Sequence, residues 1–232
     1  MKLKNITLLI VFILIVSSRV NAQNFEVFVD FEGGIPISNS LKNFHQDLAD
    51  QIPLENFKTS DNFAFNYGFR VGIRINKKAS IFYGRRVSGA KSSIADFSGF
   101  IRLTNELTGS IFGLEYEFPI KEFEKANLNL GIKGLVTPST LILETESRGG
   151  IGNQNDKLEF NSLDFGGAIA LNYEYSVGYI VLRAHLDLNV YIGGKLTLEN
   201  DDSGAYLTTP SGGRLTTGWS GITGGIGLVV PF

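Results

Sequence analysis

The sequence predicts an all-β protein: an eight-stranded antiparallel up-and-down β-barrel that crosses a membrane, with long extracellular loops and short periplasmic turns. Three observations carry this prediction. Apolar and polar side chains alternate with period two over eight separate segments, which is typical of strands with one apolar and one polar face. The links between these segments alternate between short and long. Aromatic side chains gather near one end of the apolar face.

The first residues, 1–22, are predicted to be a secretory signal peptide, and residues 23–232 a single barrel domain. Two lysines precede an apolar run over 6–16, and Ala22 ends a small-residue cleavage site. A membrane anchor is the alternative, but this run has 11 residues, whereas a spanning helix needs roughly 17–25. The chain has no cysteine, so an exported protein of this kind needs a large core or a membrane in place of disulfides.

The predicted strands differ in how strictly they alternate. In 63–75 every odd position is aromatic or β-branched, and the even positions are Ala, Asn, Gly or Arg. The segment 81–87 is interrupted, because Arg85 falls on its apolar face. The eight predicted strands are 25–35, 63–75, 81–87, 112–118, 128–136, 163–175, 180–192 and 222–232.

The links between these strands place all the irregular sequence at one end of the barrel. Neighbouring strands run in opposite directions, so every second link lies at the same end. Short links at 76–78, 119–126 and 176–178 alternate with long polar links at 36–62, 89–107, 138–160 and 193–219.

The first long link contains a candidate helix. Ser40 is available as an N-cap, and four apolar residues follow at helical spacing: Leu41, Phe44, Leu48 and Ile52. The segment forms either a short helix over the barrel mouth or an ordinary amphipathic surface turn. His45 lies within it, and a single histidine does not predict a metal site.

The apolar face is predicted to point outward, toward lipid. The better-defined strands are longer than the usual five or six residues of soluble sheets and can cross a bilayer when tilted. Trp219 is predicted to lie at the outer membrane interface. The aromatic girdle at the short-turn end comprises Phe25, Tyr83, Tyr116, Phe118, Tyr173, Tyr175 and Phe232. A soluble lipocalin-like barrel, the alternative, would turn the same apolar face inward.

With its signal peptide, eight strands, loop asymmetry and terminal aromatic residue, the chain resembles the small OmpA/OmpX-like outer-membrane β-barrel family of Gram-negative bacteria. The resemblance covers nearly all of 23–232 and is one of architecture, without a sharp sequence motif. It implies a location in the bacterial outer membrane and recognition by the outer-membrane assembly machinery. The last strand would carry that assembly signal through Ile226, Leu228, Val230 and Phe232.

With the apolar face outward, the polar face lines the lumen. An eight-stranded barrel is just wide enough for side chains to fill, and unpaired charges there would be costly. We therefore predict a packed structural network of ion pairs and hydrogen bonds. Its members are Glu26, Asp30, Glu32, Arg70, Arg74, Glu115, Glu117, Lys133, Asp164, Glu174, Arg183, His185 and Asp187.

The spacing of Arg183, His185 and Asp187 also suggests a catalytic alternative. His185 would act as base, oriented by Asp187, on a hydroxyl such as Thr223 or Ser162. Residues two apart on a strand share a face but stand about 6–7 Å apart, too far to bond directly. No G-x-S-x-G elbow surrounds a serine. The sequence therefore favours a structural role and predicts no catalytic residues.

Other classes of ligand find little support. The formal net charge is −2, and no basic stretch indicates nucleic acid. Residues 200–204 offer oxygen ligands but lack EF-hand spacing, and the glycines of 149–152 lack the strand–helix context of a phosphate loop. No cofactor and no metal are predicted.

The predicted function is therefore non-enzymatic: a scaffold in the outer-membrane bilayer that presents extracellular loops for envelope integrity or for an unspecified surface partner. Four alternatives stay open. They are an outer-membrane component of protein secretion or assembly, a small-solute channel, a lipid-modifying enzyme and a soluble exported ligand binder.

Overall fold

The computed structural model describes residues 25–52, 57–96, 99–149, 152–199, 204–209 and 212–232. The predicted signal peptide and its cleavage site after Ala22 lie outside these residues. In the described ranges, no helix is both long enough and apolar enough to pass through a membrane.

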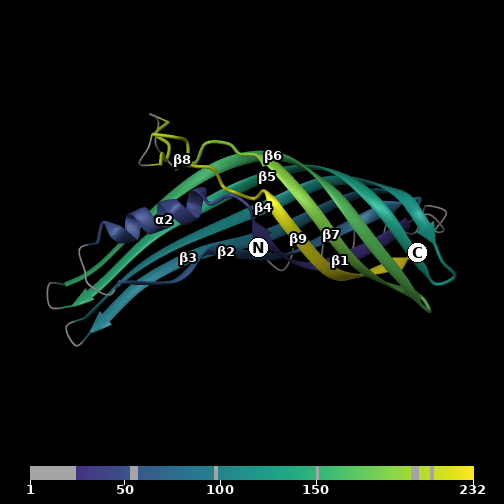
Figure 1. Ribbon diagram of the computed structural model, residues 1–232, viewed down its shortest axis with the longest axis horizontal. Helices are drawn as coiled ribbons and strands as arrows, with labels where there is room; N and C mark the ends of the chain where they lie inside the picture. The colour runs from purple at the N-terminus through teal and green to yellow at the C-terminus, as the bar shows by residue number, and fades with distance from the viewer. Residues whose placement is uncertain (1–24, 53–56, 97–98, 150–151, 200–203, 210–211) are drawn as a thin grey trace, which may run out of the picture.

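The sheet closes into a ring, which confirms the predicted eight-stranded antiparallel barrel (Figure 1). Around the ring, in the part of the chain that the structure describes, the order is β1-β2-β3-β4-β5-β6-β7-β9, and β9 pairs with β1. Every neighbouring pair is antiparallel. The ring strands are β1 (Phe25–Pro36), β2 (Lys58–Ile75), β3 (Ala79–Asp96), β4 (Gly99–Glu122), β5 (Ala126–Gly149), β6 (Gly152–Val177), β7 (Ile180–Ile192) and β9 (Gly221–Pro231). A two-residue strand, β8 (Thr197–Leu198), adds to the outer part of β6.

One end of the barrel carries the short turns and the C-terminus. β2 and β3, β4 and β5, and β6 and β7 are joined there by links of two or three residues. The backbone N–H of Phe232 donates to the carbonyl of Phe25, so the last described strand closes against the first. We call this the short-turn end and the opposite one the hairpin end.

At the hairpin end, two of the four predicted loops are strands. Residues 89–96 continue β3, 99–107 continue β4, 138–149 continue β5 and 152–160 continue β6. Their antiparallel register is unbroken up to Asp96–Gly99 and Gly149–Gly152. The prediction of irregular loops there was wrong. β1, β7 and β9 end earlier, so β2 to β6 form a wall that rises on one side above the closed ring (Figure 1).

The alternation changes phase between the ring and this raised wall: the apolar residues face outward in the ring and inward in the wall. This change explains the error. In the lower part of β4 the outward residues are apolar, and Phe112 and Leu114 are exposed. Further along the same strand the inward residues are apolar, and Leu103 and Leu107 are buried. Leu141 and Phe160 are likewise buried on β5 and β6. An outward apolar face suits lipid, and an inward one suits water outside.

A helix, α2 (Ser40–Asp50), covers the concave side of the raised wall. The open question between helix and turn is thus answered by a helix. Asn39, not Ser40, is the N-cap residue, and it makes no side-chain capping bond. Around the helix lies the outer core: Leu41, Phe44, Phe63, Ala90, Leu107, Leu141, Phe160, Leu196, Leu215 and Trp219.

Two aromatic residues predicted on the outer face lie in this core instead. Phe63 has a left-handed backbone with φ of 48°, and the β2–β3 register shifts between Asn62 and Asn66. This irregularity turns the Phe63 ring inward, where it is 5% exposed. Trp219, predicted at the outer interface, is 3% exposed. It precedes β9, and its indole N–H donates to the hydroxyl of Ser139 inside the barrel.

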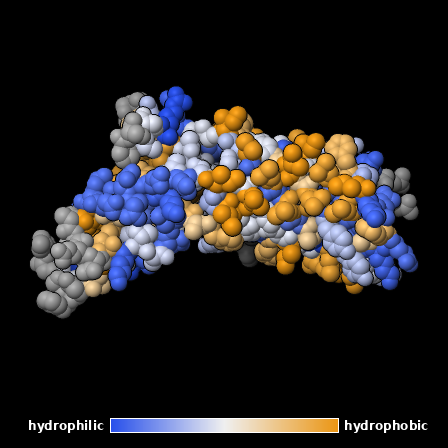
Figure 2. Space-filling view, in the orientation of Figure 1, coloured by the Kyte–Doolittle hydropathy of each residue, from blue (hydrophilic) through white to orange (hydrophobic). Residues whose placement is uncertain are grey.

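Hydrophobic residues cover the outer wall of the ring, and hydrophilic residues cover α2 (Figure 2). Phe31 is 68% exposed and Ile226 is 71% exposed, and the two residues lie opposite each other on β1 and β9. The inward face of β1 carries the buried charged residues Glu26, Asp30 and Glu32. This arrangement is the reverse of a water-soluble barrel.

Candidate functional site

The lumen at the short-turn end is filled by charges that meet at Arg74. Its guanidinium donates to the carboxylates of Glu26 and Glu174, and its Nη1 lies 3.3 Å from Oε2 of Glu117. These residues come from four different strands, β1, β2, β4 and β6. All four side chains are buried. A buried charge is tolerated when partners surround it, so this layer both fills the barrel and ties its walls together.

Arg183, the first residue of the polar series on β7, joins the same layer from the opposite side. Its Nη2 lies 2.9 Å from Oε1 of Glu117 and 3.3 Å from Oε2 of Glu115. Its guanidinium carbon stands 5.0 Å from the centre of the Phe28 ring, a cation–π distance. The Arg183 side chain therefore bridges two carboxylates and packs on an aromatic ring.

A second layer of charges lies nearer the hairpin end, around Arg70. The Arg70 guanidinium is 3.1 Å from Asp30, 3.2 Å from Glu32 and 3.2 Å from Asp187. Lys133 donates to the same Asp187 carboxylate at 2.6 Å. The two layers share Glu115, which lies 3.7 Å from the Lys133 ammonium. The lumen network is thus continuous across the barrel.

Sequence reasoning missed one member of this layer, Arg86. Its guanidinium donates to Glu32 from two nitrogens, at 2.8 and 3.0 Å. Arg86 lies on the polar face of the predicted strand 81–87, so the alternation could have revealed it. Beside it Phe82 fills the lumen, 5.4 Å from the Arg70 guanidinium carbon. The alternation assigns Phe82 to the same inward face as Arg86, four residues later, although its apolar side chain does not fit a polar face.

Asp164, predicted in the network, is buried but stands apart from it. Its carboxylate accepts hydrogen bonds from the Ser139 hydroxyl and from the backbone N–H of Gly194, both at 3.0 Å. No described cation forms an ion pair with it. The Ser139 hydroxyl also accepts a hydrogen bond from the indole N–H of Trp219, which belongs to the outer core. Asp164 therefore lies at the inner boundary of the outer core.

The catalytic alternative is not assembled in the described residues. The His185 nitrogens lie 3.9 Å from Asp30 and from Glu32, beyond hydrogen-bond distance. The Asp187 carboxylate is taken up by Lys133 and Arg70, and no bond joins it to His185.

The two candidate nucleophiles also have other partners. The Thr223 hydroxyl accepts from the amide of Asn189 at 3.0 Å, and the Ser162 hydroxyl lies 3.4 Å from Asp164. The residues of the catalytic alternative therefore serve packing and hydrogen bonding within the wall.

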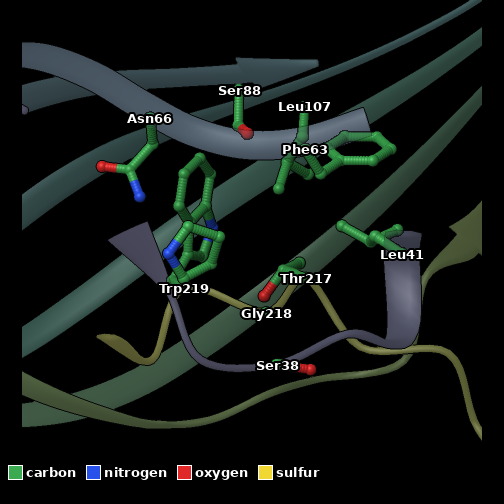
Figure 3. A pocket seen from close by; sticks show the side chains of 10 residues that line it. Ser38, Leu41, Phe63, Asn66, Ser88, Leu107, Thr217, Gly218 and Trp219 are labelled. Carbon is green, nitrogen blue, oxygen red and sulfur yellow. The ribbon is translucent and has the colours of Figure 1, made fainter. Parts of the chain in front are cut away.

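The mouth of the barrel is closed by the outer core. The cavity shown in Figure 3 has a volume of about 10 Å³, with Leu41 of α2, Phe63, Leu107 and Trp219 among its lining. A space of this size holds about one water molecule. Asn66, whose side chain borders it, supplies a polar atom for such a water. This cavity is therefore too small for a small-molecule ligand.

His45 on α2 forms a buried polar cluster that resembles a serine–histidine–asparagine triad. Its Nε2 lies 2.8 Å from the Ser92 hydroxyl and its Nδ1 lies 2.9 Å from the Asn105 amide nitrogen. Because the Asn105 N–H donates to Nδ1, the ring proton is on Nε2 and is donated to Ser92. A nucleophilic serine needs the opposite direction of donation.

Exposure also excludes catalysis at this cluster. His45 and Ser92 are 0% exposed and Asn105 is 1% exposed. A substrate could reach Ser92 only if α2 left the wall, and that movement would carry His45 away with it. The cluster therefore fastens α2 to β3 and β4.

This attachment is expected to weaken in acid. Burial lowers the pKa of His45 below its ordinary value of 6.5, and the nearby Asp61 opposes this shift only in part. A lowered pKa means that the docked state prefers neutral histidine, so docking is strongest above pH 6.5 and is lost as the pH falls through the docked-state pKa. Trp219, the single tryptophan, reports on α2 through its fluorescence. The undocked population should rise by at most tenfold per pH unit, the limit for one proton.

The control for this titration is His45→Gln, which keeps a side-chain donor but does not titrate. Its Trp219 fluorescence is expected to be flat between pH 7 and pH 4.5. An identical transition in both proteins would assign the change to another group and contradict a role for His45.

No metal centre is evident. Within the described part of the chain, no group of three or more His, Cys, Asp or Glu side chains is arranged to hold an ion.

Comparison with known proteins yields little at the level of sequence. No protein-family model matches the chain, and no curated protein matches it. Among solved structures, the crystal structure of Neisserial surface protein A (NspA) is similar at 13% sequence identity with a TM-score of 0.28. That match covers 90% of this chain and 97% of NspA. The barrel described above rests on the strand pairing of this chain itself.

Proposed function

We propose that this chain is an integral outer-membrane β-barrel protein with a non-enzymatic role. Its closed barrel serves as a scaffold that presents the raised wall and α2 at the cell surface, for envelope integrity or for contact with an extracellular partner. The observation that carries the proposal is the pairing of an outward apolar belt with a lumen of buried, paired charges.

The belt supports a bilayer as the barrel's surroundings. Large apolar side chains are exposed on every ring strand, including Val71 on β2, Ile132 on β5 and Leu186 on β7. In water, a continuous apolar surface of this extent would lead to aggregation. A soluble ligand binder would need an apolar lumen, and the described lumen is charged.

The last strand supports the predicted route into the membrane. Ile226, Leu228, Val230 and Phe232 all lie on the outer wall, 40–71% exposed, and their side chains are accessible to the assembly machinery. In this proposal they form the C-terminal assembly signal, and the outer membrane is the destination of the exported chain.

The proposal is tested by comparing boiled and unboiled protein on a semi-native gel after refolding into detergent. A detergent-resistant barrel is expected to migrate faster unboiled than boiled. Water-soluble protein that gives one band, unaffected by boiling, would contradict the proposal. It would instead point to a soluble exported binder.

A second measurement separates a scaffold from a channel. Two charged layers, the rings of Phe28 and Phe82 and the outer core all obstruct the lumen, so the folded protein is expected to give no steady conductance in planar bilayers. Empty bilayers and boiled protein are the controls. Steady, reproducible conductance steps from protein that shows the gel shift would contradict a closed lumen.

A further inference from the structure

The outer wall of β3 to β6 carries a polar hollow where the apolar belt ends. The hollow has a volume of about 530 Å³ and opens sideways, away from the lumen. Its outward-facing lining includes Arg85, Glu106, Thr108, Ser110, Thr140 and Asn161. The hollow coincides with a gap in the β4–β5 pairing, which stops at Gly109–Ser139 and resumes at Phe112–Val136. Pro138 stands in this gap and has no N–H to donate to the ladder.

The position of the hollow is set by the phase change of the alternation. On the short-turn side, the outward residues Phe112 and Val136 belong to the apolar belt. On the hairpin side, the outward residues are polar, as at Thr104 and Glu144. The hollow therefore lies at the level where lipid tails give way to headgroups.

Arg85 is the cation of this hollow, and it lacks a partner within the described chain. Every inward arginine is ion-paired, whereas no ion pair or hydrogen bond joins the exposed Arg85 side chain to another described residue. It pairs across the sheet with Phe69 and Ser110, and the outward residue two positions before it on β3, Tyr83, belongs to the apolar belt. An arginine at this depth needs an anionic partner, and phosphate suits its planar donor fork.

The remaining lining favours a sugar beside the phosphate. From β3 to β6 the hollow spans roughly 14 Å, at about 4.8 Å between strands, which is far wider than one phosphate. The Thr140 hydroxyl donates to the side-chain oxygen Oδ1 of Asn161 at 2.8 Å, and no described residue accepts a hydrogen bond from the side-chain nitrogen Nδ2 of Asn161. Glu106 lies four residues beyond Ser110, roughly 13 Å along β4, so its carboxylate can accept from hydroxyls without facing the phosphate.

We propose that this hollow binds the phosphorylated sugar headgroup of a membrane glycolipid, with a phosphate on Arg85 and sugar hydroxyls on Thr140 and Asn161. The acyl chains would lie along Phe112 and Val136 on the belt. This inference rests on the proposed function, since only a barrel in a membrane brings the hollow to a headgroup layer.

The test uses the full mature chain in detergent micelles, with lipid A as the probe, and measures bound lipid by native mass spectrometry. Phosphatidylglycerol, which is anionic but has no sugar, is the competing probe. Wild-type protein is expected to retain lipid A at least tenfold better than phosphatidylglycerol. Arg85→Gln should bind lipid A about tenfold more weakly, the effect of losing one charge-assisted hydrogen bond. Asn161→Leu should also weaken lipid A but leave phosphatidylglycerol unchanged.

The matched control is Lys91→Gln, which removes an exposed cation from the same face of β3 outside the hollow. Unchanged binding in Arg85→Gln, equal loss in Lys91→Gln, or equal retention of the two lipids would each overturn the proposal. Every sample is first run on the semi-native gel. Protein that shifts but does not bind lipid A overturns this inference alone, while wild-type protein that does not shift overturns the proposed function with it.

Discussion

The variant Arg74→Met is expected to lose about 3–5 kcal/mol of folding free energy, the cost of removing one partner from a buried ionic cluster. Three carboxylates, those of Glu26, Glu117 and Glu174, meet at this guanidinium. Methionine, like arginine, is long and unbranched, so it fills much of the same space. The loss of folding free energy would therefore reflect the missing charge more than the missing volume. The measurement is the urea concentration at which half of the refolded protein loses its gel shift.

The matched control is Arg102→Met, because Arg102 pairs with Glu146 at 3.4 Å on the exposed wall. An exposed pair contributes less than about 1 kcal/mol. If Arg74→Met fails to refold, Arg74→Met combined with Glu174→Gln should recover part of the shifted band, since it removes one of the stranded charges. Equal urea midpoints for the two single variants would mean that the lumen layer does not stabilise the barrel.

The ring of the barrel could be predicted because lipid outside and charge inside impose one strict alternation on each strand. A one-residue slip in register would place Arg74 in the belt and Ile75 in the lumen, so the odd or even position of a residue along its strand is enough to assign its face. The position does not say which residues on other strands will be its ion-pair partners. Glu26 lies directly opposite Arg74 on the neighbouring strand β1, whereas Glu174 on β6 is 100 residues away along the chain and meets Arg74 only across the closed ring.

The raised wall escaped prediction because its alternation has the opposite phase. Leu103, Leu107 and Leu141 sit at positions that look out of step with the belt, and the segment therefore resembled a polar loop. A change of phase within one alternating segment marks the level where the surroundings change from lipid to water. That signal is present in the sequence and locates the upper edge of the belt.

The contacts of α2 could not be predicted in the same way. Helical spacing indicated an apolar side through Leu41 and Phe44. Ser92 and Asn105, the partners of His45, lie on the parts of β3 and β4 beyond the predicted strands 81–87 and 112–118. The inward turn of Phe63 depends on a local break in register. Such irregular positions follow from tertiary packing and carry no periodic signal.

The variant Gly227→Ala is expected to reduce the gel-shifted fraction severely, at a cost of about 3 kcal/mol or more. An alanine Cβ at this position would lie 2.1 Å from Oδ1 of Asp30 and 2.3 Å from the backbone oxygen of Val29. Asp30 is held by Arg70, and the Val29 carbonyl belongs to the β1–β9 pairing that closes the ring. Relief of the clash therefore requires the two terminal strands of the barrel to separate. The measurement is the yield of unboiled, faster-migrating protein after refolding.

Gly134→Ala is the matched control, since a Cβ at Gly134 meets nothing within 4 Å. Both substitutions restrict the unfolded chain equally, so that effect cancels between them. The difference in refolding yield between the two variants therefore measures the steric clash between β1 and β9, the strand pair that closes the ring. A normal yield from Gly227→Ala would mean that this strand pair has room for a methyl group. Asp30 could then move away from β9 without losing its ion pair with Arg70.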